Sequence, residues 1–387
     1  MERKVLFVAS TYSHIVNFHR PYLKRFHDEG FFVCVASGGK VMDIPEADEI
    51  LHLPFQKSFT SPDNFKATLI LRQKIKREAY DLMAAHTSLA SFFARLALFG
   101  LAERPFVINM AHGYLFDDQT PWLKRNVLLA AEKIMAPKTD LLLVMNNYDY
   151  ETAQKYKLGG KIGLVPGVGV DFSRLDKMSS DLRRAIREKY GVKDNDVLLL
   201  YAAEFSARKS QSVLIRALEY LPQNVSLALA GDGATRGKCE ELAHKLGVEN
   251  RTFFLGYAPN VAQWQKAADI AVSASRSEGL PFNMIEAMHA GTPVVASRVK
   301  GHTDLIDDGK SGLLYSYGDE KELAEQITLL LKSPDVKQWI VKTAREKVEP
   351  LRLENAFNKA WDYYAEAIAD SGQRDSPGSA IATLGNS

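Results

Sequence analysis

The sequence predicts an α/β protein with two doubly wound parallel sheets, each in its own domain. Three observations support this fold class: the chain length, the alternation of short apolar runs with helix-length amphipathic segments, and the restart of that alternation in the second half. The chain has 387 residues, of which 46% are hydrophobic and 25% charged, whereas a single hydrophobic core stops growing near ~250–300 residues. Two domains of parallel β/α units are therefore expected.

The first half of the chain carries the apolar runs of the expected N-terminal sheet. The predicted strands are residues 5–10, 31–37, 82–85, 106–110, 141–145 and 162–165. The helices predicted between them include residues 17–29, 65–77, 89–99 and 122–135. Because parallel strands need such crossover segments, we assign residues 1–170 to one domain.

The second half starts the series again. The predicted strands are 197–203, 225–230, 252–255, 270–274 and 294–297, with helices at 181–190 and 210–221. We assign residues 171–352 to this domain and expect a long terminal helix (353–370, clearest over 355–370) to complete the first one. Residues 371–387 are rich in Ser, Gly, Asp and Pro without periodicity, which predicts disorder.

The composition limits which partners and which cellular compartment are expected. The formal net charge of +2 is too small for nucleic acid to be the main partner. No apolar run reaches the ~20 residues that span a bilayer, and the N-terminus lacks the layout of a signal peptide. The two cysteines, Cys34 and Cys239, form no disulfide framework. These features predict a cytoplasmic protein that meets a membrane only from the surface.

Residues 273–291 have the layout of an anion site. They read SASRSEGLPFNMIEAMHAG: a strand ends, Gly279 and Pro281 break regular structure, and a helix follows from about residue 283 to 289. Free N–H groups at the helix start, around Phe282, Asn283 and Met284, would suit a diphosphate.

Two glutamates bracket this helix start. Glu286 lies one turn into the helix, where its carboxylate could accept two hydrogen bonds from a ribose diol. Glu278 precedes the loop, within expected reach of a sugar's hydroxyls. The alternative is a surface Glu278 and a Glu286 that only complements the helix dipole. The Gly-Leu-Pro-Phe insert between them and the Glu-Ala-Met that follows favour the binding site.

The segment resembles the E-x7-E motif of glycosyltransferase family 4, a large group of retaining transferases with the GT-B fold. The resemblance covers residues 4–370 approximately, and its specificity comes from several phrases in a fixed order. They are SHIVNFHRPY (13–22), AHG (111–113), GVGVD (167–171), AGDG (230–233), AGTPVV (290–295) and IDDGKSGL (306–313). Within the family, bacterial enzymes of capsular and exopolysaccharide biosynthesis are the most similar.

The resemblance implies a fold and an activity. The fold would be GT-B, with two Rossmann-like domains facing across a cleft. The activity would be retaining transfer of a hexosyl or N-acetylhexosaminyl group from a nucleoside diphosphate sugar, expected to be a UDP-sugar, to a lipid-linked or saccharide acceptor. No cofactor or metal is expected: Asp117-Asp118 has no supporting ligands, and Gly231-Asp232-Gly233 is better explained as a tight turn.

The resemblance also assigns residues. Glu278, His112 and Lys209 form the expected catalytic set, with His112 beside the transferred sugar and Lys209 on the diphosphate. Many family members have a Gly-Arg pair where this chain has Ala203-Glu204, so Arg208 is either a substitute phosphate contact or simply solvent-exposed. The donor-binding residues are Arg208, Lys209, Gly279, Leu280, Pro281, Phe282, Asn283 and Glu286.

Histidines mark the expected acceptor side. His14 and His19 flank the first βα turn, where the family often has a glycine-rich turn and this chain has Tyr12-Ser13-His14. A lone histidine is more often a satisfied structural residue. The position of His112 at the carboxyl end of a strand favours a ligand-binding position for that residue.

Basic residues in the first domain suggest a surface for anionic membranes. They are Lys57, Lys66, Arg72, Lys74, Lys76 and Arg77, opposed before Glu78 only by Asp63. The helix expected from Trp122 adds a basic amphipathic face with an aromatic end. The alternative is an ordinary solvated helix face.

Two other functions stay open on the same fold. A UDP-sugar 2-epimerase would need a different set of acidic and histidine residues. A non-catalytic sugar-nucleotide-binding subunit would bind nucleotide without turnover.

Overall fold

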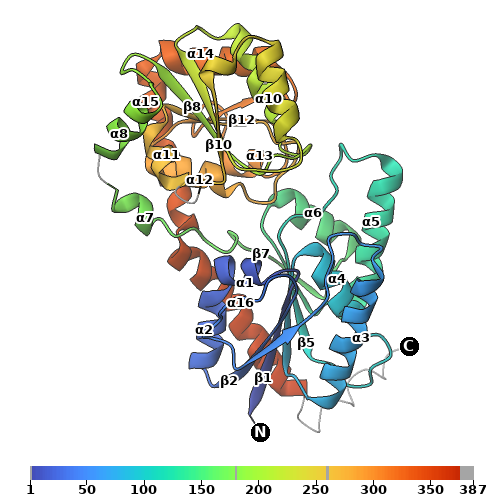
Figure 1. The fold of residues 1–387 in the computed structure, drawn as a ribbon. Coiled ribbons are helices and arrows are strands. Elements are labelled where there is room, and N and C mark those ends of the chain that lie inside the picture. The colour runs from blue at the N-terminus through green and yellow to red at the C-terminus, as the bar shows by residue number, and fades with distance from the viewer. Residues whose placement is uncertain (1, 179–180, 259–260, 375–387) are drawn as a thin grey trace. The chain divides into compact units, whose positions relative to one another are not determined.

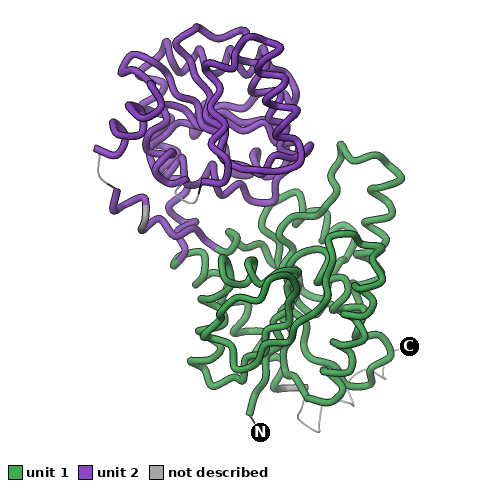
Figure 2. The backbone as a smooth tube through the Cα atoms, viewed as in Figure 1, with its two compact units in different colours: residues 1–168, 354–387 green, residues 169–353 purple. Residues whose placement is uncertain are grey.

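The computed structural model (Figure 1) describes residues 2–178, 181–258 and 261–374. The chain forms two compact units (Figure 2): unit 1 comprises residues 1–168 and 354–387, and unit 2 comprises residues 169–353. The sequence placed these divisions at 170/171 and 352/353. Among the described residues, no helix is both long and apolar enough to cross a membrane.

Unit 1 is built on a seven-stranded sheet in the order β3-β2-β1-β4-β5-β6-β7. Every pairing is parallel. The strand order reverses between β1 and β4, which makes this the topological switch point where such sheets bind ligands. The strands are β1 (Arg3–Ala9), β2 (Phe31–Ser37), β3 (Glu49–His52), β4 (Leu82–His86), β5 (Phe106–Ala111), β6 (Leu141–Val144) and β7 (Lys161–Leu164).

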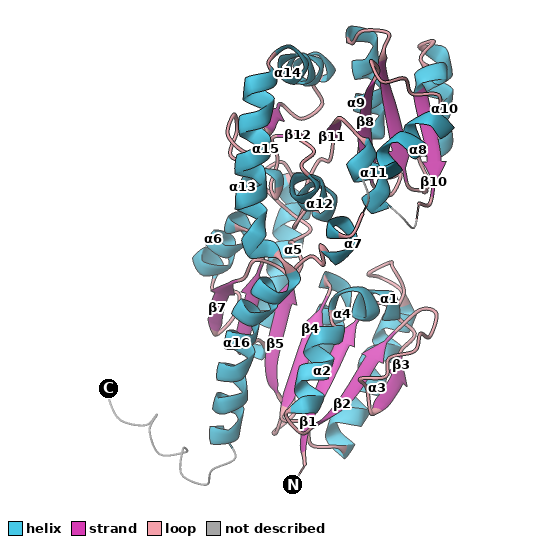
Figure 3. Cartoon of the chain, turned by 90° about the vertical axis from the view of Figure 1, so that its left-hand side faces the viewer, coloured by secondary structure: helices cyan, strands magenta, loops and turns pink. Residues whose placement is uncertain are grey.

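Helices cover both faces of the unit 1 sheet (Figure 3). Side chains alternate along β1, so that Leu6 and Val8 join the core under α3 and α4, whereas the Phe7 ring lies 5.6 Å from the ring of Phe26 in α2. Burial on both faces explains the continuous apolar runs of these strands. The helices are α1 (Tyr12–Phe18), α2 (Arg20–Asp28), α3 (Pro62–Arg77), α4 (Ser88–Leu96), α5 (Trp122–Met135) and α6 (Asn147–Tyr156).

The terminal helix α16 (Leu353–Arg374) packs on unit 1. Its Phe357 and Tyr364 rings lie 4.9 and 5.3 Å from the ring of Tyr22 in α2. The helix continues to Arg374, so the predicted disorder is wrong for residues 371–374, where the chain continues the helical hydrogen bonding. The rest of that predicted segment, 375–387, lies outside the described residues.

Two helices replace the single helix predicted at residues 17–29. The chain breaks at His19, whose φ and ψ are −119° and −3°, and α2 starts again with Pro21 in its first turn. Proline has no N–H to continue the α1 hydrogen bonds, and its ring disfavours an uninterrupted helix. The break moves His19 out of a regular helical position.

Unit 2 has a six-stranded parallel sheet in the order β10-β9-β8-β11-β12-β13. Its switch point lies between β8 and β11, since the strand order reverses there. The strands are β8 (Val197–Ala202), β9 (Val225–Ala230), β10 (Thr252–Gly256), β11 (Ile270–Ser273), β12 (Val294–Ser297) and β13 (Leu313–Tyr315).

The helices of unit 2 also form two layers. One core packs β8 and β9 against α9, α10 and α14, and another packs β11 and β12 against α7, α12 and α15. The two ends of the unit pair with each other, because the Val170 N–H donates to the Leu351 carbonyl and the Leu353 N–H donates to the Val170 carbonyl, both at 2.9 Å. The helices are α7 (Ser173–Asp176), α8 (Asp181–Lys189), α9 (Gln211–Ala217), α10 (Arg236–Lys245), α11 (Val261–Ala267), α12 (Phe282–Ala290), α13 (His302–Leu305), α14 (Glu320–Lys332) and α15 (Pro334–Val348).

Candidate active site

The switch point of unit 2 joins two loops that are far apart in sequence. One follows β8 and carries Arg208 and Lys209, and the other follows β11 and leads to Glu278. The Arg276 N–H donates to the Arg208 carbonyl at 2.8 Å. The Tyr201 hydroxyl of β8 donates to the Lys209 carbonyl at 3.2 Å and lies 2.8 Å from the Ser275 hydroxyl oxygen in the other loop. These bonds hold the two loops in register, so the basic and acidic side chains come together.

Glu278 accepts hydrogen bonds from both basic residues. Its Oε1 lies 2.5 Å from Lys209 Nζ and its Oε2 lies 3.1 Å from Arg208 Nη1. Glu278 is buried, with 7% of its surface exposed. Burial raises the pKa of its carboxyl group, but the charges of Lys209, His302 and Arg208 outweigh burial and lower the pKa below its usual value. The carboxylate is therefore ionised at neutral pH, and its burial excludes the surface-residue alternative.

A pocket of about 690 Å³ opens beside this ion pair. Of the predicted donor-binding residues it contains Lys209, Leu280, Pro281, Phe282, Asn283 and Glu286, together with the predicted catalytic Glu278, whereas Arg208 and Gly279 are not part of its wall. The remaining wall comes from the ends of β8 and β9, from the loop that follows β10, and from α11. It consists of Ala202, Ala203, Glu204, Ala230, Gly231, Asp232, Tyr257, Ala258 and Val261.

The start of α12 differs from its prediction. The helix begins at Phe282, and the Pro281 carbonyl accepts the Met284 N–H at 3.0 Å while the Leu280 carbonyl accepts the Phe282 N–H at 3.1 Å. The expected free N–H groups at Phe282 and Met284 are thus wrong, because the turn at Pro281 uses them. The side chain of Asn283 instead offers a donor, since its buried Nδ2 has no hydrogen-bond partner among the described residues.

Of the two alternatives predicted for Arg208, solvent exposure holds in part, and the phosphate contact stays a prediction. Its guanidinium donates to Glu278 and, at 2.8 Å, to the Ser277 carbonyl, yet 51% of the side chain is exposed. Lys209 is the more enclosed cation, with 13% of its side chain exposed. A diphosphate would therefore meet one buried and one accessible positive charge.

The structure adds two residues that the sequence reasoning missed, Gly301 and His302. A Cβ at Gly301 would lie 2.7 Å from the Glu278 carbonyl oxygen, and its φ is +83°, so only glycine fits. His302 is fully buried, and its Nδ1 lies 2.8 Å from the Ser297 carbonyl oxygen. The one available signal was a glycine shortly after the strand that ends at Ser297. Nothing local indicated that this turn supports Glu278.

Gly231 and Gly233 pack closely against the loop that follows β8. Added Cβ atoms would lie 2.1 Å from the Ala203 carbonyl oxygen and 2.4 Å from the Phe205 carbonyl oxygen. The turn between them is close-packed against the loop after β8, which gives a structural reason for the Gly-Asp-Gly stretch.

Four histidines gather at the switch point of unit 1. The Nε2 atoms of His14 and His112 lie 3.4 Å apart, His112 Nε2 lies 3.5 Å from His86 Nδ1, and the rings of His19 and His86 are 3.8 Å apart between centroids. Burial lowers the pKa of His14 to about 4 and, with charge repulsion from neighbouring histidines, lowers the pKa values of the other three well below 6.5. The predicted His14, His19 and His112 are thus neutral neighbours, and His86 was missed because it ends an apolar strand.

Two of the predicted basic side chains on α3 have partners inside the unit. Lys74 is buried and ion-paired with Glu49 and Glu78, both at 2.6 Å. Arg72 donates to the Ala97 and Phe99 carbonyls. The expectation that only Asp63 opposes these charges is wrong, since Glu49 comes from β3, a strand that the sequence did not reveal.

Helix α5 of unit 1 carries an apolar face instead. Leu123, Val127 and Ile134 have 69%, 61% and 59% of their surface exposed, and Trp122 has 76%. The spacing of the three aliphatic residues places them along one side of the helix. Figure 1 shows α5 at the edge of its unit.

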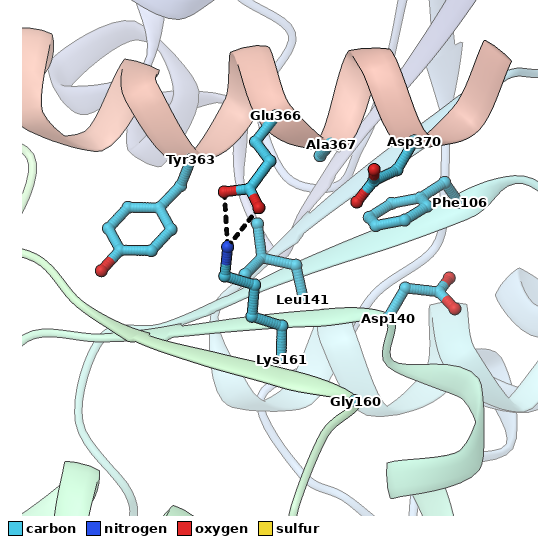
Figure 4. Close-up of a pocket in the computed structure, with 9 residues that line it drawn as sticks. All are labelled: Phe106, Asp140, Leu141, Gly160, Lys161, Tyr363, Glu366, Ala367 and Asp370. Atoms are coloured by element: carbon cyan, nitrogen blue, oxygen red, sulfur yellow. Dashed lines mark hydrogen bonds and ion pairs between the residues drawn. The ribbon is translucent and has the colours of Figure 1, made fainter. Parts of the chain in front are cut away.

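A second cavity, of about 210 Å³, lies between α16 and the beginnings of β5, β6 and β7 (Figure 4). Lys161 points toward Glu366 across it, and the two form an ion pair at 2.5 Å. Parallel α/β sheets bind ligands at the carboxyl ends of their strands. This cavity lies at the amino ends, so we assign the active site elsewhere.

Comparison with known proteins identifies the class. The family model described as "Glycosyl transferases group 1" matches residues 183–347, and that described as "Glycosyltransferase Family 4" matches residues 20–174. A Bacillus subtilis (strain 168) protein named "Putative glycosyltransferase EpsD" is 32% identical over 341 residues, which cover 87% of this chain and 89% of that protein. An Escherichia coli UDP-Gal:alpha-D-GlcNAc-diphosphoundecaprenol alpha-1,3-galactosyltransferase is 25% identical over 320 residues, covering 79% and 81%.

Solved structures share the fold. Anabaena Alr3699/HepE, in complex with UDP and glucose, has a TM-score of 0.79 at 20% identity, with 94% of this chain and 100% of that chain covered. WaaG, a glycosyltransferase involved in lipopolysaccharide biosynthesis, has a TM-score of 0.73 at 19% identity, with 93% and 99% covered.

Two Rossmann-like units of this topology define a GT-B glycosyltransferase fold, which confirms the predicted fold class. The chain belongs to the group 1 glycosyltransferases of glycosyltransferase family 4, as the E-x7-E segment predicted.

Proposed function

We propose that this protein is a retaining glycosyltransferase that moves a hexosyl or N-acetylhexosaminyl group from a UDP-sugar to a hydroxyl of a lipid-linked or saccharide acceptor in cell-surface polysaccharide biosynthesis. The observation that carries the proposal is the buried, ionised Glu278 held between Lys209 and Arg208 beside a pocket that also contains Glu286. Support for UDP comes from HepE, which binds it. Support for a lipid-linked acceptor comes from the name of the E. coli relative.

Different residues of the pocket bind different parts of the donor. Glu286 binds the nucleotide ribose, Lys209 and Arg208 bind the diphosphate, and Glu278 accepts hydrogen bonds from the sugar hydroxyls. Charge builds on the diphosphate as the glycosidic bond breaks, so the two cations stabilise the transition state more than the ground state. Burial strengthens this effect, because the effective dielectric constant around Lys209 is low.

The anomeric configuration is retained because the acceptor attacks, and gives up its proton, on the same face of the sugar that the diphosphate leaves. The acceptor oxygen attacks the anomeric carbon as the diphosphate leaves, and a phosphate oxygen takes the acceptor proton. No residue of this chain is needed as a nucleophile, and no metal is needed while Lys209 and Arg208 supply the positive charge. His112 contacts the transferred sugar, and His14 and His19 lie on the acceptor side.

Peripheral attachment to the inner face of the plasma membrane is part of the proposal. The exposed apolar face of α5, with Leu123, Val127 and Ile134, is suited to insert at a lipid interface next to Lys124. Attachment there would place unit 1 near a lipid-linked acceptor.

A donor screen tests the proposal. The protein is incubated with UDP-, GDP- and ADP-sugars, binding is measured by thermal shift, and products with acceptor are identified by mass. We expect stabilisation by UDP-sugars and transfer with retained anomeric configuration. Epimerisation of a donor incubated alone, detected by NMR, would favour the epimerase, whereas UDP-sugar binding without turnover of any tested acceptor or donor would favour the binding subunit.

A further inference from the structure

The histidine cluster at the switch point of unit 1 has the spacing of a metal site. Ring nitrogens of His14, His19 and His112 all lie within 4.8 Å of one another, and the Nε2 atoms of His14 and His112 are 3.4 Å apart. A tetrahedral ion with metal–nitrogen bonds of about 2.0–2.1 Å holds its ligand nitrogens about 3.3 Å apart. The His14–His112 pair already has this separation. His19 would need to approach by at most about 1.5 Å to complete the geometry.

Three buried ring nitrogens of the cluster lack a hydrogen-bond partner within the described part of the chain. Neither nitrogen of His19 nor the Nε2 of His86 has a hydrogen-bond partner among residues 2–178, 181–258 and 261–374. Both side chains are fully buried. Such groups are uncommon in native proteins unless a ligand, an ion or water satisfies them. Their lone pairs are therefore available to an ion.

The chemistry of the cluster selects the class of ion. Three ring nitrogens, one from each of His14, His19 and His112, lie within 4.8 Å of one another, a spacing that suits a single ion better than the several hydroxyls of a sugar. A set made only of imidazoles favours Zn²⁺, Cu²⁺, Ni²⁺ or Co²⁺ over Mg²⁺ and Ca²⁺, which prefer oxygen.

We propose that His14, His19 and His112 bind one divalent transition-metal ion beside His86. The inference goes beyond the proposed function, because transfer at Glu278 requires no metal and the ion can be measured without donor or acceptor. Since His112 is also the proposed sugar contact, an ion bound here would compete with the donor sugar and inhibit transfer.

The test uses the full chain without an affinity tag, stripped with a chelator and dialysed. Zn²⁺ binding is measured by calorimetry, and Co²⁺ coordination by visible absorption. We expect one ion per chain and the absorption of four-coordinate Co²⁺. His14→Ala removes a ligand that is partly exposed, so the fold should survive, and we expect at least ~10-fold weaker binding, since even outer-shell changes cost about 10–100-fold.

Two further variants make the result decisive. His244→Ala is the matched control, because the His244 side chain is 84% exposed in unit 2, and its binding should equal that of the wild type. His112→Gln, checked for folding by circular dichroism, should lose the Co²⁺ spectrum. Absence of Zn²⁺ binding by the wild type, or equal affinity of the wild type and His14→Ala, would overturn the proposal. Neither result would bear on UDP-sugar binding.

Discussion

Lys209 Nζ lies 2.5 Å from Glu278 Oε1 at the switch point of the unit 2 sheet, with 13% and 8% of the two side chains exposed. A buried ion pair costs desolvation free energy that its mutual attraction recovers only in good geometry. Here both partners line a pocket, so the pair is also positioned to exchange its internal contact for contacts with a ligand. The proposed donor would supply phosphate oxygens to Lys209 and hydroxyl donors to Glu278.

Replacing Glu278 tests the charge balance of the site. Glu278→Gln leaves Lys209 buried without its anionic partner, so we expect a loss of about 3 kcal/mol in the free energy of unfolding at pH 7. Because the pKa of Glu278 is lowered in the folded protein, its stabilising contribution is present above the unfolded pKa, near ~4.3, and disappears as the pH falls through the folded value.

Urea unfolding of the wild type and Glu278→Gln between pH 7.5 and pH 3.5 measures this effect. The difference between the two proteins should be constant above about pH 5 and shrink below about pH 4. A difference that is absent at pH 7, or that grows on acidification, would show that Glu278 is not held ionised by its neighbours.

Lys209 should dominate the stabilisation of the leaving group. We expect Lys209→Met to lower kcat/KM for transfer by roughly 100-fold or more, as is typical when one transition-state donor is removed. Arg208→Met should cause a smaller loss, because its side chain is 51% exposed. Initial rates with saturating acceptor measure both, and Lys238→Met, an exposed lysine on α10, is the control. Wild-type kcat/KM in Lys209→Met would remove this residue from the mechanism.

The exposed face of α5 predicts membrane binding. Full burial of a leucine side chain in lipid is worth about 2 kcal/mol, so Leu123→Ser should reduce cosedimentation with phosphatidylglycerol vesicles by roughly 10-fold or more. Leu329→Ser is the matched control, because Leu329 is an exposed leucine of unit 2. Since most basic side chains of α3 are paired, we expect only a modest effect of salt. Equal vesicle binding by the wild type and Leu123→Ser would exclude this face of α5 as the membrane-binding surface.

The sequence predicted the central strands well for a physical reason. Strands buried on both faces appear in the sequence as continuous apolar runs. The observed bounds of β2, β9 and β12 agree with the predicted bounds residue for residue. The edge strand β3 was missed, because Glu49–His52 is partly exposed and has only two apolar residues, Ile50 and Leu51, between two polar ones. That omission also hid Glu49, the partner of Lys74.

The sequence predicted which residues lie together where a motif is continuous, but not where the fold brings distant residues together. Glu278 and Glu286 share one segment, and both line the pocket. Gly301 and His86 reach their sites only through sheet topology, and no local pattern marks them. The N–H groups at the start of α12 were assigned wrongly because a sequence does not reveal that Pro281 closes a turn there.

The assignment of the pocket beside Glu278 to a UDP-sugar is tested most directly by calorimetric titration of UDP into the wild type and Glu286→Ala. Loss of a charged acceptor for the ribose diol should weaken UDP binding by about 10–100-fold, since hydrogen bonds to charged groups contribute about 1.5–3 kcal/mol. Glu325→Ala, an exposed glutamate of α14, should bind UDP like the wild type. Failure of the wild type to bind UDP, or equal affinity in Glu286→Ala, would contradict the assignment.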